Sequence, residues 1–263
     1  YSKRDGEFVE LSKGAQSGEN FNERGCDARA EQQALAPGHV LDYTSIGLLA
    51  TFGVTRVSVY ARPNVAILAT GDEIVEPHET PAPHQIRNSN AYSLAAQVTR
   101  AGGIPRILPV ARDNYDSTRS LIEQGLESYL LLMSGGVSAG KYDIVEQVLA
   151  ELGAEFYFTR VKVQPGQPLV FGSARGTFFF GLPGNPASTI VTFEVFARVA
   201  LELLSGIAEP RRVLAWAKLT HEFRHKAGLT RFLPALLSDS GDLTPQKWSG
   251  SADIGALARS NAF

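Results

Sequence analysis

The stretch that decides the fold spans residues 131–143 and reads LLMSGGVSAGKYD. It begins with apolar residues, changes to Ser134, Gly135 and Gly136, and ends at Asp143. A short apolar run bounded by a glycine turn is typical of a buried strand. Residues 141–153 then place apolar side chains at helical spacing and end in a glycine, which predicts a helix. We therefore expect a strand, a glycine turn and a helix, in that order.

The same alternation continues on both sides of this stretch. Apolar runs predict strands at 64–70, 104–110, 129–135, 155–163, 168–172 and 176–182, and helical spacing predicts helices at 89–103, 116–128, 141–153 and 185–206. Asn185 is the expected cap of the last helix, and Pro186 its first residue. Strands that alternate with helices predict an α/β fold, a three-layer α/β/α arrangement around a largely parallel sheet.

The two flanks of the chain differ from its middle. We expect an N-terminal segment at 1–62 with one helical stretch (45–53), the α/β domain at 63–207, and a small C-terminal β domain at 208–263. Alternating runs at 212–223 and 230–237 are read as strands of that tail. The proline-rich stretch 76–87 is a long loop, and the sequence leaves open whether it is functional or merely irregular.

Composition excludes several classes of function. The net charge of −2 and a pI near 6.3, without a Lys/Arg cluster, argue against a nucleic-acid partner. No apolar run is long enough for a membrane span, so no membrane partner is expected. Cys26 is the only cysteine, which predicts no internal disulfide and a cytoplasmic location. Because the chain starts at Tyr1 and stops at ARSNAF, we expect a fragment or trimmed ends.

Four predicted strand ends supply polar or glycine-rich residues. Ligands of parallel sheets bind beyond the carboxyl ends of the strands. The segments there are TGDE (70–73), ARD (111–113), SGGVSAGKYD (134–143) and GLPGNPAS (181–188). Glycine turns that open helices offer N–H groups to anions, and the carboxylates offer oxygen ligands to a cation. The pattern favours a site for a phosphorylated ligand with a divalent metal; tight packing turns and helix caps are the alternative.

Other reactive residues have simpler explanations. The segment HEFRH (221–225) fits the H-E-x-x-H zinc pattern, but its surroundings alternate like a strand and no third ligand follows. His39, His78 and His84 are expected at the surface. Cys26 lacks a nearby histidine partner, which favours an ordinary thiol over a nucleophile.

Several motifs together resemble one known family. They are ATGDEI (69–74), RNSN (87–90), SGGVSAGKYD, VQPGQPLVFG (163–172) and GLPGNPAS, with SGENFNERGCD (17–27) before them and SGSADIGALARSNAF (249–263) after them. In this order they look like the molybdopterin molybdenumtransferases, a family that includes the C-terminal domain of gephyrin. The resemblance implies a molybdopterin-binding α/β domain, an elongated N-terminal dimerisation segment and a C-terminal β domain.

The resemblance also implies a reaction, in which molybdate and adenylated molybdopterin are the substrates and molybdenum cofactor and AMP the products. It implies Mg²⁺, a homodimer, and possibly the molybdopterin adenylyltransferase as a partner. Glu73, Asp113 and Asp143 would be catalytic, and Glu73 and Asp143 would hold the metal. The implied substrate-binding residues are Thr70, Gly71, Asp72, Asn88, Asn90, Ser134, Gly135, Gly136, Val137, Ser138, Gly140, Arg160, Gln164, Pro165, Gly166, Pro183, Gly184, Asn185, Pro186, Ser188 and Ser251.

This chain departs from the family pattern at several positions. Gln164 and Gln167 replace lysines of the KPGKP turn, so they can hydrogen-bond an anion but bring no charge. Arg160 and Lys162 are candidates to compensate. Further departures are Cys26, Asn88, Leu229 and Pro234. They leave open a non-catalytic binding or scaffold module of the same fold. A third hypothesis is an enzyme of the pterin-adenylating or nicotinamide-nucleotide-processing type, which shares the SGG turn; the N-terminal and tail segments argue against it, because those relatives lack them.

Overall fold

The structure is a computed structural model that describes residues 1–135, 144–210, 214–225 and 227–263. Contacts within the chain group it into two compact units, Tyr1–Gly53 and Val54–Phe263. None of the helices in these described stretches is long and apolar enough to cross a membrane.

The first unit has little regular structure. Strands β1 (Ser2–Asp5) and β2 (Phe8–Leu11) form an antiparallel hairpin, and α1 (Tyr43–Thr51) confirms the predicted helical stretch. Asp42 caps this helix by accepting a hydrogen bond from the Ser45 backbone N–H at 2.8 Å. Hydrogen bonds from Thr44 and Ser45 hold the pKa of the Asp42 carboxyl below its ordinary value.

The second unit is built on a six-stranded sheet with strand order β6-β3-β7-β11-β10-β8. The strands are β3 (Asn64–Ala69), β6 (Ile104–Ile107), β7 (Leu130–Ser134), β8 (Glu155–Phe158), β10 (Val170–Ala174) and β11 (Thr177–Leu182). Neighbours β6, β3, β7 and β11 run parallel, whereas β10 runs antiparallel to both β11 and β8. The predicted largely parallel sheet is confirmed.

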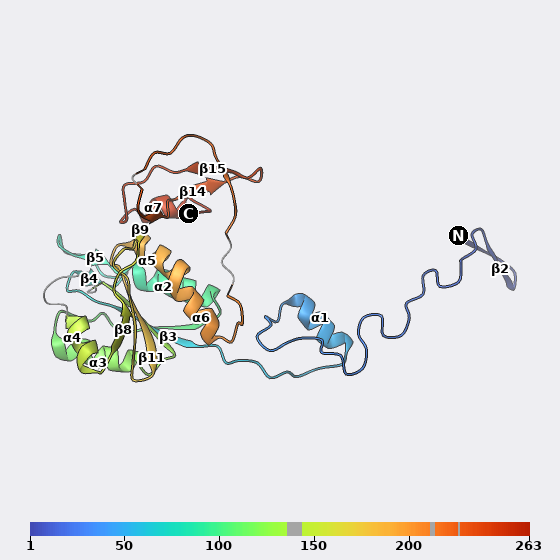
Figure 1. Cartoon of the computed structure of the whole chain (residues 1–263), viewed down its shortest axis with the longest axis horizontal. Coiled ribbons are helices and arrows are strands. Elements are labelled where there is room, and N and C mark those ends of the chain that lie inside the picture. Colours follow the sequence, from blue (N-terminus) through green and yellow to red (C-terminus); the bar gives the residue numbers. More distant parts are fainter. Residues whose placement is uncertain (136–143, 211–213, 226) are drawn as a thin grey trace. The chain divides into compact units, whose positions relative to one another are not determined.

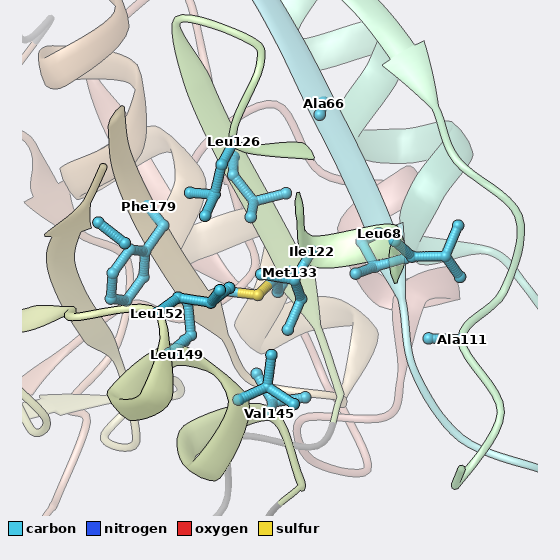
Figure 2. Packing of buried hydrophobic residues seen from close by; sticks show 14 of the residues in the cluster. Ala66, Leu68, Ala111, Ile122, Leu126, Met133, Val145, Leu149, Leu152 and Phe179 are labelled. Atoms are coloured by element: carbon cyan, nitrogen blue, oxygen red, sulfur yellow. The ribbon is translucent and has the colours of Figure 1, made fainter. Parts of the chain in front are cut away.

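Helices cover both faces of this sheet (Figure 1). One face packs against α3 (Tyr115–Gly125) and α4 (Ile144–Glu151), and the other against α2 (Asn90–Arg100) and the long helical segment 186–204. Successive side chains of the central strands point to opposite faces of the sheet, as the two-residue period of a strand requires. Figure 2 shows Met133 of β7 among side chains of α3, α4 and β11. Because helices cover both faces, the central strands are continuous apolar runs.

The long helix predicted at 185–206 is present but not uniform. It consists of α5 (Pro186–Thr192), a π-helical turn η1 (Phe193–Ala197) and α6 (Arg198–Leu204). Pro186 is its first residue, as predicted. Asn185 occupies the cap position but makes no side-chain cap hydrogen bond. Its side chain is therefore available for another contact.

Two short ladders lie outside the main sheet. Strands β4 (Ile74–Val75) and β5 (Ile86–Arg87) pair in parallel and close the proline-rich stretch between them into a loop. Strand β9 (Val163–Gln164) pairs with β13 (Thr230–Arg231) of the tail. The single strand predicted at 155–163 is therefore wrong over 159–162, where the chain leaves the main sheet.

The tail forms a small sheet with strand order β12-β15-β14. Its strands are β12 (Lys218–Leu219), β14 (Ala235–Leu237) and β15 (Asp242–Pro245), followed by α7 (Ile254–Ala258). Within the described part of the run predicted as a strand at 212–223, only Lys218 and Leu219 pair. Trp216 in that run is fully exposed.

Candidate functional site

A cleft of about 890 Å³ lies at the carboxyl edge of the main sheet. Strands β3, β7 and β11 end there, and antiparallel β10 begins there. The chain thus brings five separate segments and part of the tail to one place. The predicted residues that line the cleft are Thr70, Glu73, Asn88, Asn90, Ser134, Gly135, Gln164, Pro165, Gly166, Pro183, Gly184, Asn185, Pro186, Ser188 and Ser251.

The floor of the cleft is formed by the ends of β3 and β7. The Thr70 N–H donates to the Ser134 carbonyl at 3.1 Å, which ties the two strand ends together. Gly135 follows with φ +86°, a conformation that favours glycine, and a Cβ there would lie 2.7 Å from the Thr70 carbonyl oxygen. Glycine at this position therefore permits both the sharp turn and the close approach of the two backbones.

The start of α2 supplies a second side of the cleft. Asn90 donates from Nδ2 to Ser134 Oγ at 3.2 Å and to the Gly184 carbonyl at 2.8 Å, which links three separate segments. Asn88 is 2 % exposed and accepts a hydrogen bond from the Ala91 N–H in the first turn of α2 at 3.2 Å. Among the described residues, the buried oxygens Asn90 Oδ1 and Thr70 Oγ1 have no hydrogen-bond partner.

The segment 163–168 supplies a third side. Gly166 has φ +102°, and a Cβ there would lie 2.3 Å from Thr192 Cγ2. Gln164 Oε1 accepts a hydrogen bond from the Arg231 guanidinium. Gln164 stands where the family pattern has a lysine, and its amide oxygen is therefore already bonded to Arg231 of the tail.

The tail closes the fourth side with Trp248, Gly250, Ser251 and Ala252. Asn185 Nδ2 donates to Ser251 Oγ at 2.9 Å, which is the contact that replaces its cap bond. The Ala187 N–H donates to the Ser251 carbonyl at 3.0 Å. We expected the backbone N–H groups at the start of α5 to face an anion, but the Ala187 N–H is bonded to the tail instead.

A carboxylate holds this part of the tail in place. Asp253 accepts hydrogen bonds from the Ser249 and Ala256 backbone N–H groups, each at 3.0 Å. These backbone bonds, Ser249 first, lower the pKa of the Asp253 carboxyl from its ordinary value, with a smaller contribution from Arg259.

The predicted catalytic acids have different positions. Glu73 lines the cleft. Asp113 is exposed and absent from the lining, and its backbone N–H donates to Asp72 Oδ1 at 3.1 Å. Asp143 lies outside the described residues. Within the described ranges, Glu73 is the only carboxylate in the lining, and no group of three His, Cys, Asp or Glu could hold a metal. The described acids alone therefore do not form a site for Mg²⁺, and no chemical step is assigned to a metal.

The remaining predicted residues divide into two sets. Gly71, Asp72 and Arg160 lie outside the lining of the cleft. Gly136, Val137, Ser138 and Gly140 lie outside the described residues. The H-E-x-x-H segment 221–225 is not helical, so its two histidines lack the spacing that a zinc site needs.

Sequence reasoning missed several lining residues. Arg87 had a signal, because it is the first residue of the RNSN motif that we quoted. Gly250 had a signal too, because it lies in the quoted motif SGSADIGALARSNAF next to the predicted Ser251, and Trp248 lies one residue before that motif. Val163 had the same signal, because it is the first residue of the quoted motif VQPGQPLVFG.

Known proteins are similar to this chain in sequence and in fold. The chain is 33 % identical over 260 residues to a protein of Bacillus subtilis named molybdopterin molybdenumtransferase, covering 97 % of this chain and 60 % of the relative. A Nostoc protein of the same name is 36 % identical over 204 residues, covering 76 % of this chain and 47 % of the relative. The chain thus spans about half to three fifths of the length of these relatives.

Solved structures give the same result. The crystal structure of the molybdopterin biosynthesis moeA protein from Pyrococcus horikosii superposes with a TM-score of 0.76 at 27 % identity, covering 99 % of this chain and 64 % of that one. A molybdenum cofactor biosynthesis protein from Pyrococcus furiosus superposes with a TM-score of 0.67 at 26 % identity, covering 90 % and 73 %. A family model described as a probable molybdopterin binding domain matches residues 66–203, which contain three of the four sides of the cleft. This chain belongs to that family.

Proposed function

We propose that this chain is the molybdopterin-binding part of a molybdopterin molybdenumtransferase, which inserts molybdate into adenylated molybdopterin and releases AMP. Similarity over 97 % of the chain to a relative of that name supports the proposal. The single structural observation behind it is the convergence of separated motifs on one cleft of about 890 Å³. A cleft of this volume is within the usual range for small-molecule sites.

The lining of the cleft suits a polar, anionic ligand. Its polar lining residues include Ser251, Asn185 and Gln167, and Arg87 adds a positive charge. We assign substrate binding to the predicted residues that line the cleft. Glu73 is the proposed acid next to the reacting phosphate. The roles of Asp113 and Asp143, the Mg²⁺ ion, the homodimer, the adenylyltransferase partner and the cytoplasmic location stay predictions.

The test is AMP release from adenylated molybdopterin with and without molybdate. We expect molybdate-dependent release, and Glu73→Gln to reduce its rate on the order of 10²- to 10³-fold. Glu127→Gln is the matched control, because Glu127 is also exposed but lies outside the lining of the cleft. Wild-type turnover in Glu73→Gln would contradict the role of Glu73, and no release by the wild-type chain would contradict the activity.

A binding module without catalysis is the second candidate. The observation that favours it is the low positive charge of the cleft: Gln164 and Gln167 are neutral, and Gln164 is already bonded to Arg231. Binding of the adenylated pterin without release of AMP, under conditions where a full-length relative is active, would identify this second function.

A further inference from the structure

The charge of the cleft depends on very few side chains. Among the lining residues that the structure describes, Arg87 is the only cation and Glu73 the only anion. The substitutions at Gln164 and Gln167 leave the third side of the cleft neutral. An anionic group bound in the cleft therefore has one cationic side chain to meet within the described lining.

The backbone of Arg87 is held by its own ladder. Strand β5 pairs with β4 so that Arg87 lies opposite Val75, and the Asn88 N–H donates to the Val75 carbonyl at 2.8 Å. The Arg87 side chain donates from Nε to the Pro77 carbonyl at 3.1 Å. These bonds hold the Arg87 backbone and one guanidinium nitrogen, and leave Nη1 and Nη2 to other partners. No ion pair found in the described residues includes Arg87.

A nearby carboxylate is occupied by neutral donors. Glu76 accepts from the Tyr92 hydroxyl at 2.8 Å and from Asn88 Nδ2 at 3.3 Å. The hydrogen bond to Glu76 raises the pKa of Tyr92, so the phenol stays protonated as the donor. Asn88, which replaces the usual aspartate of the family pattern, supplies an amide donor that an aspartate would lack. Glu76 thus ties the loop 76–87 to α2.

We propose that Arg87 binds the oxygens of a tetrahedral oxyanion in the cleft, either a phosphate of the ligand or molybdate. A planar guanidinium can donate two parallel hydrogen bonds to such a group, which a lysine cannot. The Glu76 contacts with Tyr92 and Asn88 position the segment that carries Arg87. This inference deepens the proposed function and rests on it for the identity of the ligand.

The test is titration of the whole chain with AMP, inorganic phosphate and molybdate as separate probes. We expect Arg87→Gln to weaken binding of at least one probe on the order of 10-fold or more, and Arg87→Lys to restore only part of the loss. The probe that loses affinity identifies the source of the oxyanion. Arg106→Gln is the matched control, because Arg106 is also an exposed arginine that donates to a backbone carbonyl, that of Gln124, and it lies outside the lining.

Several outcomes would overturn the inference. They are unchanged affinity for every probe in Arg87→Gln, an equal loss in Arg106→Gln, or no binding of any probe by the wild-type chain. Circular dichroism of each variant checks that the fold is intact. AMP release that is equal in wild type and Arg87→Gln would overturn this inference and leave the proposed function standing. Anion binding that depends on Arg87, in a chain that releases no AMP, would support the inference and contradict the proposed function.

Discussion

Two walls of the cleft are built in different ways. The sheet wall (Thr70, Ser134 and Gly135) follows strands β3 and β7, in which residues 65–68 and 130–133 are completely buried. The tail wall (248 and 250–252) belongs to the tail of the chain. Among the described tail residues from 214 onward, only Pro234, Ala235 and Ala256 are buried apolar side chains. One wall is positioned by a hydrophobic core, and the other by hydrogen bonds.

This difference decides what a substitution should do. Fully burying a large apolar side chain stabilises a fold by about 1.5–3 kcal/mol, and a single hydrogen bond by about 0.5–1.5 kcal/mol. Changes behind the sheet wall should therefore lower the stability of the whole α/β domain. Changes in the tail wall should alter the cleft while the domain stays folded.

The largest effect is expected in the core behind the sheet wall. Phe179 is fully buried in the same cluster as Leu149 of α4 (Figure 2). It also makes an edge-to-face contact with Phe156 of β8. Phe179→Ala should lower the free energy of unfolding by about 3–5 kcal/mol, because it leaves a cavity that the neighbours cannot fill. The measurement is urea denaturation. Phe263→Ala in the tail, where the ring is 43 % exposed, is the control and should cost much less; equal losses would contradict the comparison.

The next effect is expected at the turn of the sheet wall. Gly135→Ala should cost about 2–4 kcal/mol, because a positive φ strains any other residue and the new Cβ would meet the Thr70 carbonyl. Gly102 is a matched control, since its φ is +89° and no atom lies within 4 Å of a Cβ there. Gly102→Ala should cost only the strain, about 1–2 kcal/mol. Similar losses of stability in both variants would show that the close approach to Thr70 is unimportant.

The sheet wall could be predicted from sequence, and the tail wall largely could not. Continuous apolar runs followed by glycine turns mark buried parallel strands, and the parallel order then places Thr70, Ser134 and Pro183 at one edge without further information. These are local signals. They were sufficient for the sheet, for its helices and for one side of the cleft.

The failures have a common physical cause. Val163 and Gln164 leave the main sheet because they pair with Thr230 and Arg231, which are distant in sequence, and alternation in one segment says nothing about such a partner. Trp248 likewise belongs to the tail, which is distant in sequence from the other residues that line the cleft. The resemblance to a family supplied Ser251, whereas spacing and periodicity supplied no residue of the tail wall.

A smaller effect is expected where the two walls meet. Asn185→Ala removes the hydrogen bond to Ser251 and should cost about 1 kcal/mol, together with a loss of affinity for the adenylated pterin, because Ser251 is no longer held. Asn261 is a matched control, since its side chain bonds the Leu237 backbone within the tail and it lies outside the lining. Asn261→Ala should lower stability similarly but leave the affinity unchanged. An unchanged affinity in Asn185→Ala would show that the position of the tail wall does not affect binding of the adenylated pterin.

The smallest effect is expected at Asp253, and it depends on pH. The pKa of this carboxyl is lower in the folded chain than its ordinary value, so the folded state favours the charged form. Its contribution to stability is therefore complete above the ordinary aspartate pKa of about 4 and is lost as the pH falls below that value. The Ser249 and Ala256 N–H groups then lose a charged acceptor, and the tail wall should loosen before the sheet unfolds.

Asp253→Asn tests this difference between the walls. Asparagine keeps a capping oxygen but no charge, so we expect a small decrease in stability at pH 7 that disappears as the pH falls below about 4. The fluorescence of Trp248, measured in Trp216→Phe protein so that it is the only tryptophan, reports on the tail wall, and circular dichroism reports on the sheet. In the parent chain the fluorescence change should precede the loss of helix signal on acidification. A simultaneous change of both signals would mean that the tail wall has no local stability of its own, and that the sheet holds both sides of the cleft.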